Sequence, residues 1–196
     1  MYRFYLAVID MLPGAILFVP IYCILNKFYF QNARKSILYF LFSCYLSVIY
    51  VLVGLPNVTY IRPDLNLNLI PFAGMIGDWK NSILNVVLFI PLGIMLPILW
   101  NEFRKQKNTL ICGFCASLAI ELMQILTFRA TDVNDLITNT LGAYLGFTCT
   151  KAFLPKHRPS DKRKACEPII VPGIVLLVMF FVYPFVSSAL CDWILR

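Results

Sequence analysis

Three carboxylates lie close together in a sequence that is otherwise mostly apolar: Glu121, Asp132 and Asp135. The chain is 60% hydrophobic and only 14% charged, so each of these side chains lies within or next to an apolar segment. Charged side chains at membrane depth are costly and usually mark a functional site. Carboxylates can accept hydrogen bonds, exchange protons or coordinate a hard cation through oxygen. The stretch from Glu121 to Gly146 is therefore the first candidate for such a site.

The polar residues at the end of this stretch repeat with the spacing of one helix face. Positions three and four residues apart share a face. The stripe consists of Asp132, Asp135, Asn139, Gly142 and Gly146. It starts with two carboxylates and ends with two glycines, which have no side chain to cover the backbone. The glycine pair predicts close packing against another helix, so the polar end of the stripe is the part that could bind a ligand.

Polar residues on neighbouring helices would lie at a similar depth. Glu121 and Gln124 are three residues apart and share a face. At a rise of about 1.5 Å per residue, Glu121 would lie about 10 Å and Gln124 about 6 Å from the end of their helix. Asn139 would lie about 10 Å from Asp132 along the next helix, and Asn85 just inside the same end of a third helix. These positions predict a polar, partly hydrated pocket in one half of a bundle.

Six apolar segments of about 20 residues must position these groups. The mean hydropathy of the 196 residues is +0.76, which is typical of polytopic membrane proteins. We therefore predict an all-α fold, a polytopic integral membrane helical bundle with about six transmembrane helices in a single membrane domain, 1–196. The predicted spans are 1–26, 37–55, 83–100, 110–128, 132–153 and 169–190.

The connections between the spans differ in pattern and charge. Residues 65–72, LNLNLIPF, alternate with a period of two, which predicts extended chain. When the connections are assigned alternately to the two sides, twelve of the 17 Lys and Arg residues fall on one side and five on the other. The positive-inside rule then predicts that both termini, the bend and the extended connection are outside. The net charge of +7 thus indicates topology and contact with anionic lipid, not nucleic acid.

Cysteine and histidine usage gives no sign of a metal centre or a redox cofactor. Most of the seven cysteines lie within apolar segments, where cysteine packs as a small hydrophobic residue. Cys112 and Cys115 form a CxxC, but no second pair follows it and His157 is the only histidine. A structural zinc site needs four suitable ligands. We therefore expect no cofactor, although the number of carboxylates permits a divalent cation with oxygen ligands.

The candidate residues also have purely structural interpretations. Asp132 and Asp135 could cap a helix and stabilise its dipole. Asn85 and Gln124 could form hydrogen bonds between helices, and Arg129 could pair with Asp132 or lie among lipid headgroups. The glutamate in the fourth span is the hardest to explain in this way, because a lone carboxylate at that depth must be protonated, paired or solvated.

The order and spacing of these residues resemble those of a known family. The matching residues are Arg62, Asn66, Asn68, Pro71 and Phe72; Asn85, Phe89, Pro91 and Gly93; Glu121 and Gln124; and Ala130, Thr131, Asp132, Val133, Asp135, Ile137, Thr138, Asn139, Thr140, Gly142 and Gly146. This set is similar to that of the VanZ-like membrane proteins, a family associated with resistance to the lipid-bearing glycopeptide antibiotic teicoplanin. The resemblance implies a VanZ-like core at about 62–147, an extra N-terminal helix pair (4–55) and one C-terminal helix (169–190).

The resemblance also implies a membrane protein of the bacterial cell envelope that lowers susceptibility to teicoplanin-type glycopeptides. Its outward-facing pocket would bind a lipid-linked envelope component or the lipoglycopeptide itself, in contact with membrane lipids. Basic side chains would meet anionic groups, amides would bind sugars or peptide groups, and carboxylates would accept hydrogen bonds. The expected ligand-binding residues are Arg62, Asn85, Glu121, Gln124, Arg129, Asp132, Asp135 and Asn139.

Two other functions fit the same residues. In an intramembrane enzyme that modifies a lipid-linked cell-wall or lipid precursor, Glu121, Asp132 and Asp135 would be the catalytic candidates, with Glu121 as general acid or base. Arg129 would then stabilise developing negative charge. The sequence has no Ser/His or Cys/His arrangement typical of nucleophilic catalysis, which favours a role that is not enzymatic. A small transporter is a further alternative, but the polar residues stay in one half of the bundle.

Overall fold

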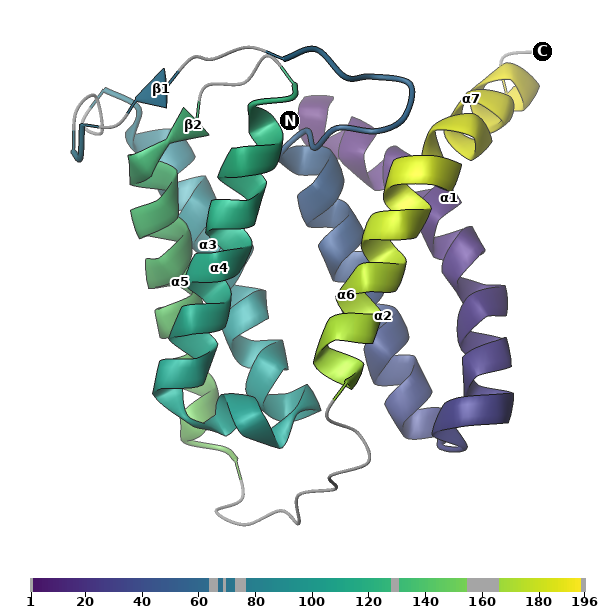
Figure 1. The fold of residues 1–196 in the computed structure, drawn as a ribbon, viewed down its shortest axis with the longest axis horizontal. Coiled ribbons are helices and arrows are strands. Elements are labelled where there is room, and N and C mark those ends of the chain that lie inside the picture. Colours follow the sequence, from purple (N-terminus) through teal and green to yellow (C-terminus); the bar gives the residue numbers. More distant parts are fainter. Residues whose placement is uncertain are drawn as a thin grey trace. The chain divides into compact units, whose positions relative to one another are not determined.

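The structure is a computed structural model that describes residues 2–63, 67–68, 70–72, 77–127, 131–154 and 166–194. Most of these residues are helical (Figure 1), which confirms the predicted all-α class. The chain forms two compact units. Unit 1 consists of Met1–Ile61 with Arg163–Arg196, and unit 2 consists of Arg62–Lys162.

The described part of unit 2 contains three long helices, one short helix and a two-stranded parallel sheet. Its elements in chain order are β1 (Leu67–Asn68), α3 (Trp79–Leu99), the 3₁₀ helix η2 (Asn101–Arg104), α4 (Gln106–Gln124), β2 (Thr131–Asp132) and α5 (Val133–Lys151). Leu67 pairs with Thr131 and Asn68 with Asp132. Both strands lie at the end of the unit where α4 ends and α5 begins (Figure 1). The prediction of extended chain is confirmed at β1.

Glycines bring the backbones of α3 and α5 into direct contact. A Cβ added to Gly146 would lie 2.0 Å from the carbonyl oxygen of Ile90, and one added to Gly142 would lie 2.2 Å from that of Val86. Real Cβ atoms are not found this close to another heavy atom, so only glycine allows these two helices to approach as they do. The predicted packing role of the glycine pair is therefore confirmed.

Unit 1 contains the remaining helices. Its elements are α1 (Tyr2–Leu25), the π-helix η1 (Asn26–Phe30), α2 (Ala33–Leu52), α6 (Glu167–Leu177), the π-helix η4 (Val178–Val182) and α7 (Tyr183–Ile194). The side chain of Asn32 caps α2 by accepting a hydrogen bond from the Lys35 amide at 3.1 Å, as expected of an N-cap asparagine. Phe18, Tyr39 and Met179 are completely buried in its core.

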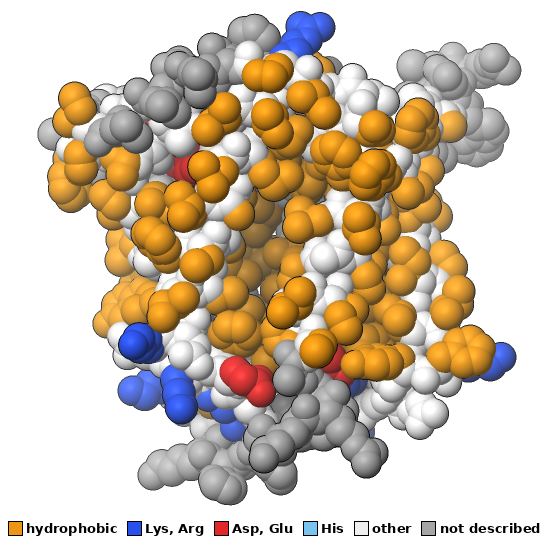
Figure 2. Space-filling model, in the orientation of Figure 1, with side chains coloured by type: hydrophobic (Ala, Val, Ile, Leu, Met, Phe, Trp, Pro, Cys, Tyr) orange, Lys and Arg blue, Asp and Glu red, His pale blue; other side chains and the backbone are white. Residues whose placement is uncertain are grey.

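Four of the described helical segments are long and apolar enough to cross a membrane: Pro13–Phe30, Ala33–Leu52, Trp79–Leu99 and Glu167–Ala189. The helices α4 and α5 have 19 residues each but contain more polar residues, so they do not meet the same criterion. Six spans were predicted, and these two helices carry the candidate site. Hydrophobic side chains cover the helices on the face shown in Figure 2, as expected for a protein surrounded by lipid.

Candidate functional site

The buried carboxylate of Glu121 holds the connection between α4 and α5. Glu121 is only 3% exposed, and its helix α4 packs against α5. Its Oε2 accepts a hydrogen bond from the Asp132 amide at 2.9 Å. Its main-chain oxygen accepts a second from the Thr131 hydroxyl at 3.0 Å. One residue of α4 therefore fixes both residues of β2, and we call the described residues from Glu121 to Asp135 the α4–α5 junction.

Asp132 is the N-cap of α5. Its Oδ1 accepts a hydrogen bond from the Asn134 amide at 2.8 Å, which satisfies one of the free amides in the first helical turn. Its Oδ2 accepts another from Asn68 Nδ2 at 3.1 Å. Asp135 follows in the first turn of the helix, where a negative charge is favoured by the helix dipole. The capping interpretation of Asp132 is confirmed, and the side chain is still half-exposed.

The segment that contains β1 is attached to the α4–α5 junction at several points. Besides the Asn68–Asp132 contact, Asn134 Oδ1 accepts a hydrogen bond from the Phe72 amide at 2.7 Å. Phe72 has a φ of 64°, a conformation that is uncommon for a large side chain. The main-chain amide of Arg62 donates to Leu126 O at 2.8 Å. These contacts place Arg62, Asn68 and Phe72 next to the junction.

A second polar layer lies deeper between α4 and α5. Ser117 is one turn along α4 from Glu121, and its hydroxyl lies 2.9 Å from the amide nitrogen of Asn139 on α5. Asn139 is 3% exposed, and its Oδ1 has no hydrogen-bond partner among the described residues. Gln124 is also buried, close to Glu121 on α4. The helix interface therefore contains polar groups over at least two turns.

The remaining candidates are more accessible. Arg62 is exposed, and Asn85 and Asp135 are half-exposed. The side chain of Asn85, on α3, makes no hydrogen bond with the described residues. Arg129, which was expected to contact an anionic group, lies outside the described residues, as does Asn66 of the resembling motif. Exposure thus divides the candidates into a buried set and an accessible set.

Three residues of this arrangement were not among the predicted site residues: Ser117, Thr131 and Asn134. Ser117 lies four residues before Glu121, so helical spacing alone could have identified it. Asn134 lies between the two predicted aspartates, but its contact with Phe72 depends on a backbone course that the sequence pattern does not specify. Asn68 had been noted only as part of the resemblance.

Within the described ranges, no group of three or more His, Cys, Asp or Glu side chains is placed to hold a metal ion. Cys112 and Cys115 lie within α4 as free thiols. The carboxylates and amides of the described junction residues can form hydrogen bonds and attract cationic groups.

Comparisons with known proteins find a family match over more than half of the chain. The VanZ/LLP1 family model matches residues 36–154, a range that includes all of the described junction. Protein VanZ of Enterococcus faecium is 35% identical over 127 residues, which cover 60% of this chain and 71% of that protein. No solved structure matches the chain. The chain therefore belongs to the VanZ/LLP1 family of membrane proteins, the family associated with teicoplanin resistance.

Proposed function

We propose that this protein lowers the susceptibility of a bacterial cell to teicoplanin-type glycopeptides by binding a polar ligand at the α4–α5 junction. The ligand would be a lipid-linked envelope component or the lipoglycopeptide itself. The observation that carries the proposal is the buried carboxylate of Glu121, which holds the accessible carboxylate of Asp132 through its main-chain amide. Family membership supplies the biological setting.

The two sets of residues would have different roles. Glu121, Gln124 and Asn139 are buried, so they would hold the junction in shape. Asp132 and Asp135 are half-exposed, and their carboxylates would accept hydrogen bonds from hydroxyl, amide or ammonium groups of the ligand. Asn85 would add an amide contact. Arg62, which is exposed, and Arg129 would meet its anionic groups.

The charge distribution supports an outward-facing site. Twelve of the 17 Lys and Arg residues fall on one side of the predicted topology and five on the other. If the more basic side is cytoplasmic, both termini and the α4–α5 junction are outside. Glycopeptides and lipid-linked wall precursors meet at that surface, so this orientation gives the ligand direct access to the site.

The proposal is tested by Asp135→Asn and Asn85→Ala in a susceptible host, with the minimum inhibitory concentration of teicoplanin measured at equal membrane abundance. Loss of one hydrogen bond to a charged group costs about tenfold in binding, so protection should fall clearly. Glu102→Gln is the matched control, because Glu102 is an exposed acid on η2. Full protection in both variants would refute the proposed site.

The same strains also separate binding from catalysis. Lipid extracts from cells with and without the protein are compared by mass spectrometry. Under the proposal the envelope lipids are the same in both extracts, because the ligand is bound and released unchanged. A new or missing lipid species that depends on Glu121 would instead indicate an enzyme and would overturn the binding mechanism.

A further inference from the structure

A hollow lies between α1 and α2 in unit 1. Its volume is about 230 Å³, and its lining is almost entirely apolar. Val19 and Cys23 of α1 and Ala33, Ile37 and Phe40 of α2 form much of its wall. Val19 is 51% and Ile37 is 58% exposed, so the hollow opens on the surface of two membrane-spanning helices. Because this surface faces lipid, an acyl chain is the apolar group that can reach it.

Two basic residues directly follow, in the sequence, residues that line this hollow. Asn26 and Ala33 line it, and each is followed directly by a basic residue, Lys27 and Arg34. Both basic side chains are exposed. The short turn between them is held by Asn26, whose Oδ1 accepts a hydrogen bond from the Asn32 amide at 3.1 Å. This turn keeps the two cationic residues at the same end of the helix pair.

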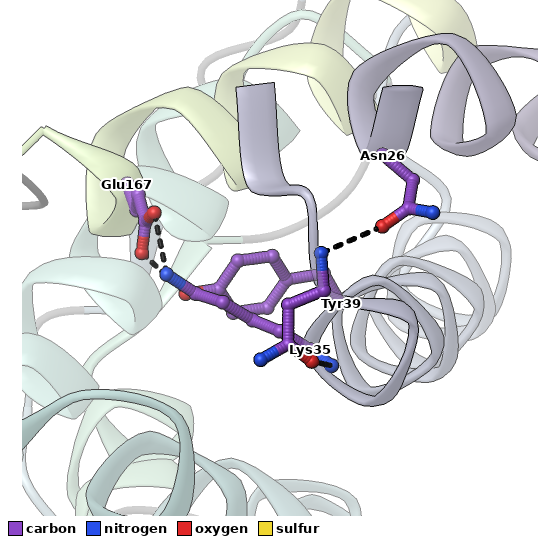
Figure 3. A network of polar contacts seen from close by, with 5 residues as sticks. Asn26, Lys35, Tyr39 and Glu167 are labelled. Carbon is purple, nitrogen blue, oxygen red and sulfur yellow. Dashed lines mark hydrogen bonds and ion pairs between the residues drawn. The ribbon is translucent and has the colours of Figure 1, made fainter. Parts of the chain in front are cut away.

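The third basic residue of this turn is already neutralised. Lys35 Nζ lies 2.6 Å from Glu167 Oε1, and the Tyr39 hydroxyl donates to Glu167 Oε2 at 2.6 Å (Figure 3). Glu167 is the one acidic residue of unit 1 whose side chain the structure describes. Among the described residues, Lys27 and Arg34 form no ion pair. The end of the hollow therefore carries two positive charges that no described acid balances.

We propose that this hollow is a binding site for an anionic phospholipid. One acyl chain occupies the apolar hollow, and the phosphate group lies between Lys27 and Arg34. A lipid is the occupant that fits, because it joins a long apolar chain to a negative charge at the membrane edge. Juxtamembrane basic residues attract such headgroups, and arginine binds phosphate through two parallel hydrogen bonds. This site is separate from the proposed function and does not depend on it.

The test is native mass spectrometry of the full chain in detergent, titrated with phosphatidylglycerol or phosphatidylcholine of identical acyl chains. The intact protein should bind phosphatidylglycerol more tightly. In Lys27→Gln/Arg34→Gln this preference should fall about fivefold for each charge removed. Ala33→Phe, which fills the hollow, should weaken binding of both lipids. Lys105→Gln/Lys107→Gln is the control, because it removes two exposed charges from unit 2 and should leave the preference unchanged.

Equal binding of the two lipids to the intact protein would overturn the proposal. So would a preference that survives in Lys27→Gln/Arg34→Gln to the same extent as in the control. If a variant is unstable, a photoactivatable phosphatidylglycerol on the intact protein provides the second measurement. Cross-links should concentrate on residues 19–40. Cross-links spread over all helices, or a dimer mass with the hollow covered by a second copy, would contradict a lipid site.

Discussion

Two glutamates are almost completely buried among the described residues, one in each unit, and their partners differ. Glu167 in unit 1 is 2% exposed and is bound by the ammonium group of Lys35 and the hydroxyl of Tyr39. Glu121 in unit 2 is 3% exposed and accepts a hydrogen bond from the main-chain amide of Asp132. The first arrangement joins the helices α2 and α6 through side chains. The second fixes the backbone of the α4–α5 connection, which carries further carboxylates.

This difference indicates which buried acid is related to a site. The contacts of a carboxylate with lysine and tyrosine have a structural role, because they hold its two helices together. A carboxylate that binds a main-chain amide fixes the course of the chain, and at the α4–α5 junction that chain presents Asp132 and Asp135 at partly exposed positions.

Removal of the buried acid in unit 1 should have the largest effect. Glu167→Ala leaves Lys35 and Tyr39 without their partner, and breaking a buried ion pair costs about 3 kcal/mol or more. The free energy of unfolding, measured by equilibrium denaturation in micelles, should fall by about this amount. Lys35→Met combined with Glu167→Leu should restore much of the loss, because no charge is then left unpaired. Unchanged stability of Glu167→Ala would show that the pair contributes little.

Backbone packing in unit 2 is tested by Gly146→Ala. The added methyl group would meet Ile90 O at 2.0 Å, so α3 and α5 must separate at a cost of about 2 kcal/mol. Gly173→Ala is the matched control in unit 1, because no atom lies within 4 Å of the added Cβ. Alanine is also the better helix former, so the control should be neutral or slightly stabilising. Equal losses in both variants would contradict the close packing of α3 and α5.

Much of this fold follows from local patterns in the sequence. Apolar runs of about 20 residues identified the long helices, and the spacing of Gly142 and Gly146 indicated a packed face. The cap at Asp132 follows from residue type and position. The second span was expected at 37–55 and is observed at Ala33–Leu52, because the cap at Asn32 starts the helix earlier than its apolar run.

The tertiary contacts of the site could not be read from the same patterns. The hydrogen bonds that the Asp132 amide donates to Glu121 and that Asn139 donates to Ser117 depend on how α4 and α5 are rotated against each other. Periodicity shows which residues share a face, but it does not show which residues of another helix they meet. The pairing of β1 with β2 joins segments far apart in sequence through only two residues each, which is too short for a strand pattern to indicate a partner.

The role of Glu121 is tested by comparing two substitutions. Glu121→Ala removes the acceptor for the Asp132 amide and should cost about 2 kcal/mol of stability and abolish protection against teicoplanin. Glu121→Gln keeps a carbonyl acceptor, so it should cost about 1 kcal/mol or less and keep most of the protection. Stability is measured by unfolding in micelles, and protection at equal membrane abundance. A stable Glu121→Gln variant without protection would show that the charge itself is needed. Glu121 would then differ from Glu167 in its chemistry and not only in its hydrogen-bond partners.

The smallest effect on stability is expected for Asp132→Asn. Asparagine is as good an N-cap as aspartate, and Asn68 can turn its amide to accept the remaining hydrogen bond, so the loss should be below about 0.5 kcal/mol. Asn32→Asp is the matched exchange in unit 1, because Asn32 caps α2 in the same way. It should change neither stability nor protection.

The two caps should nevertheless differ in function. Under the proposed function, the Asp132 carboxylate contacts the ligand, so Asp132→Asn should reduce protection although its helix stays capped. Protection is measured as the minimum inhibitory concentration of teicoplanin, and helix integrity by the unfolding midpoint. If Asp132→Asn protects as well as the unchanged chain, Asp132 serves the fold in the same way as Asn32, and the ligand contacts must then come from Asp135, Asn85 and the arginines.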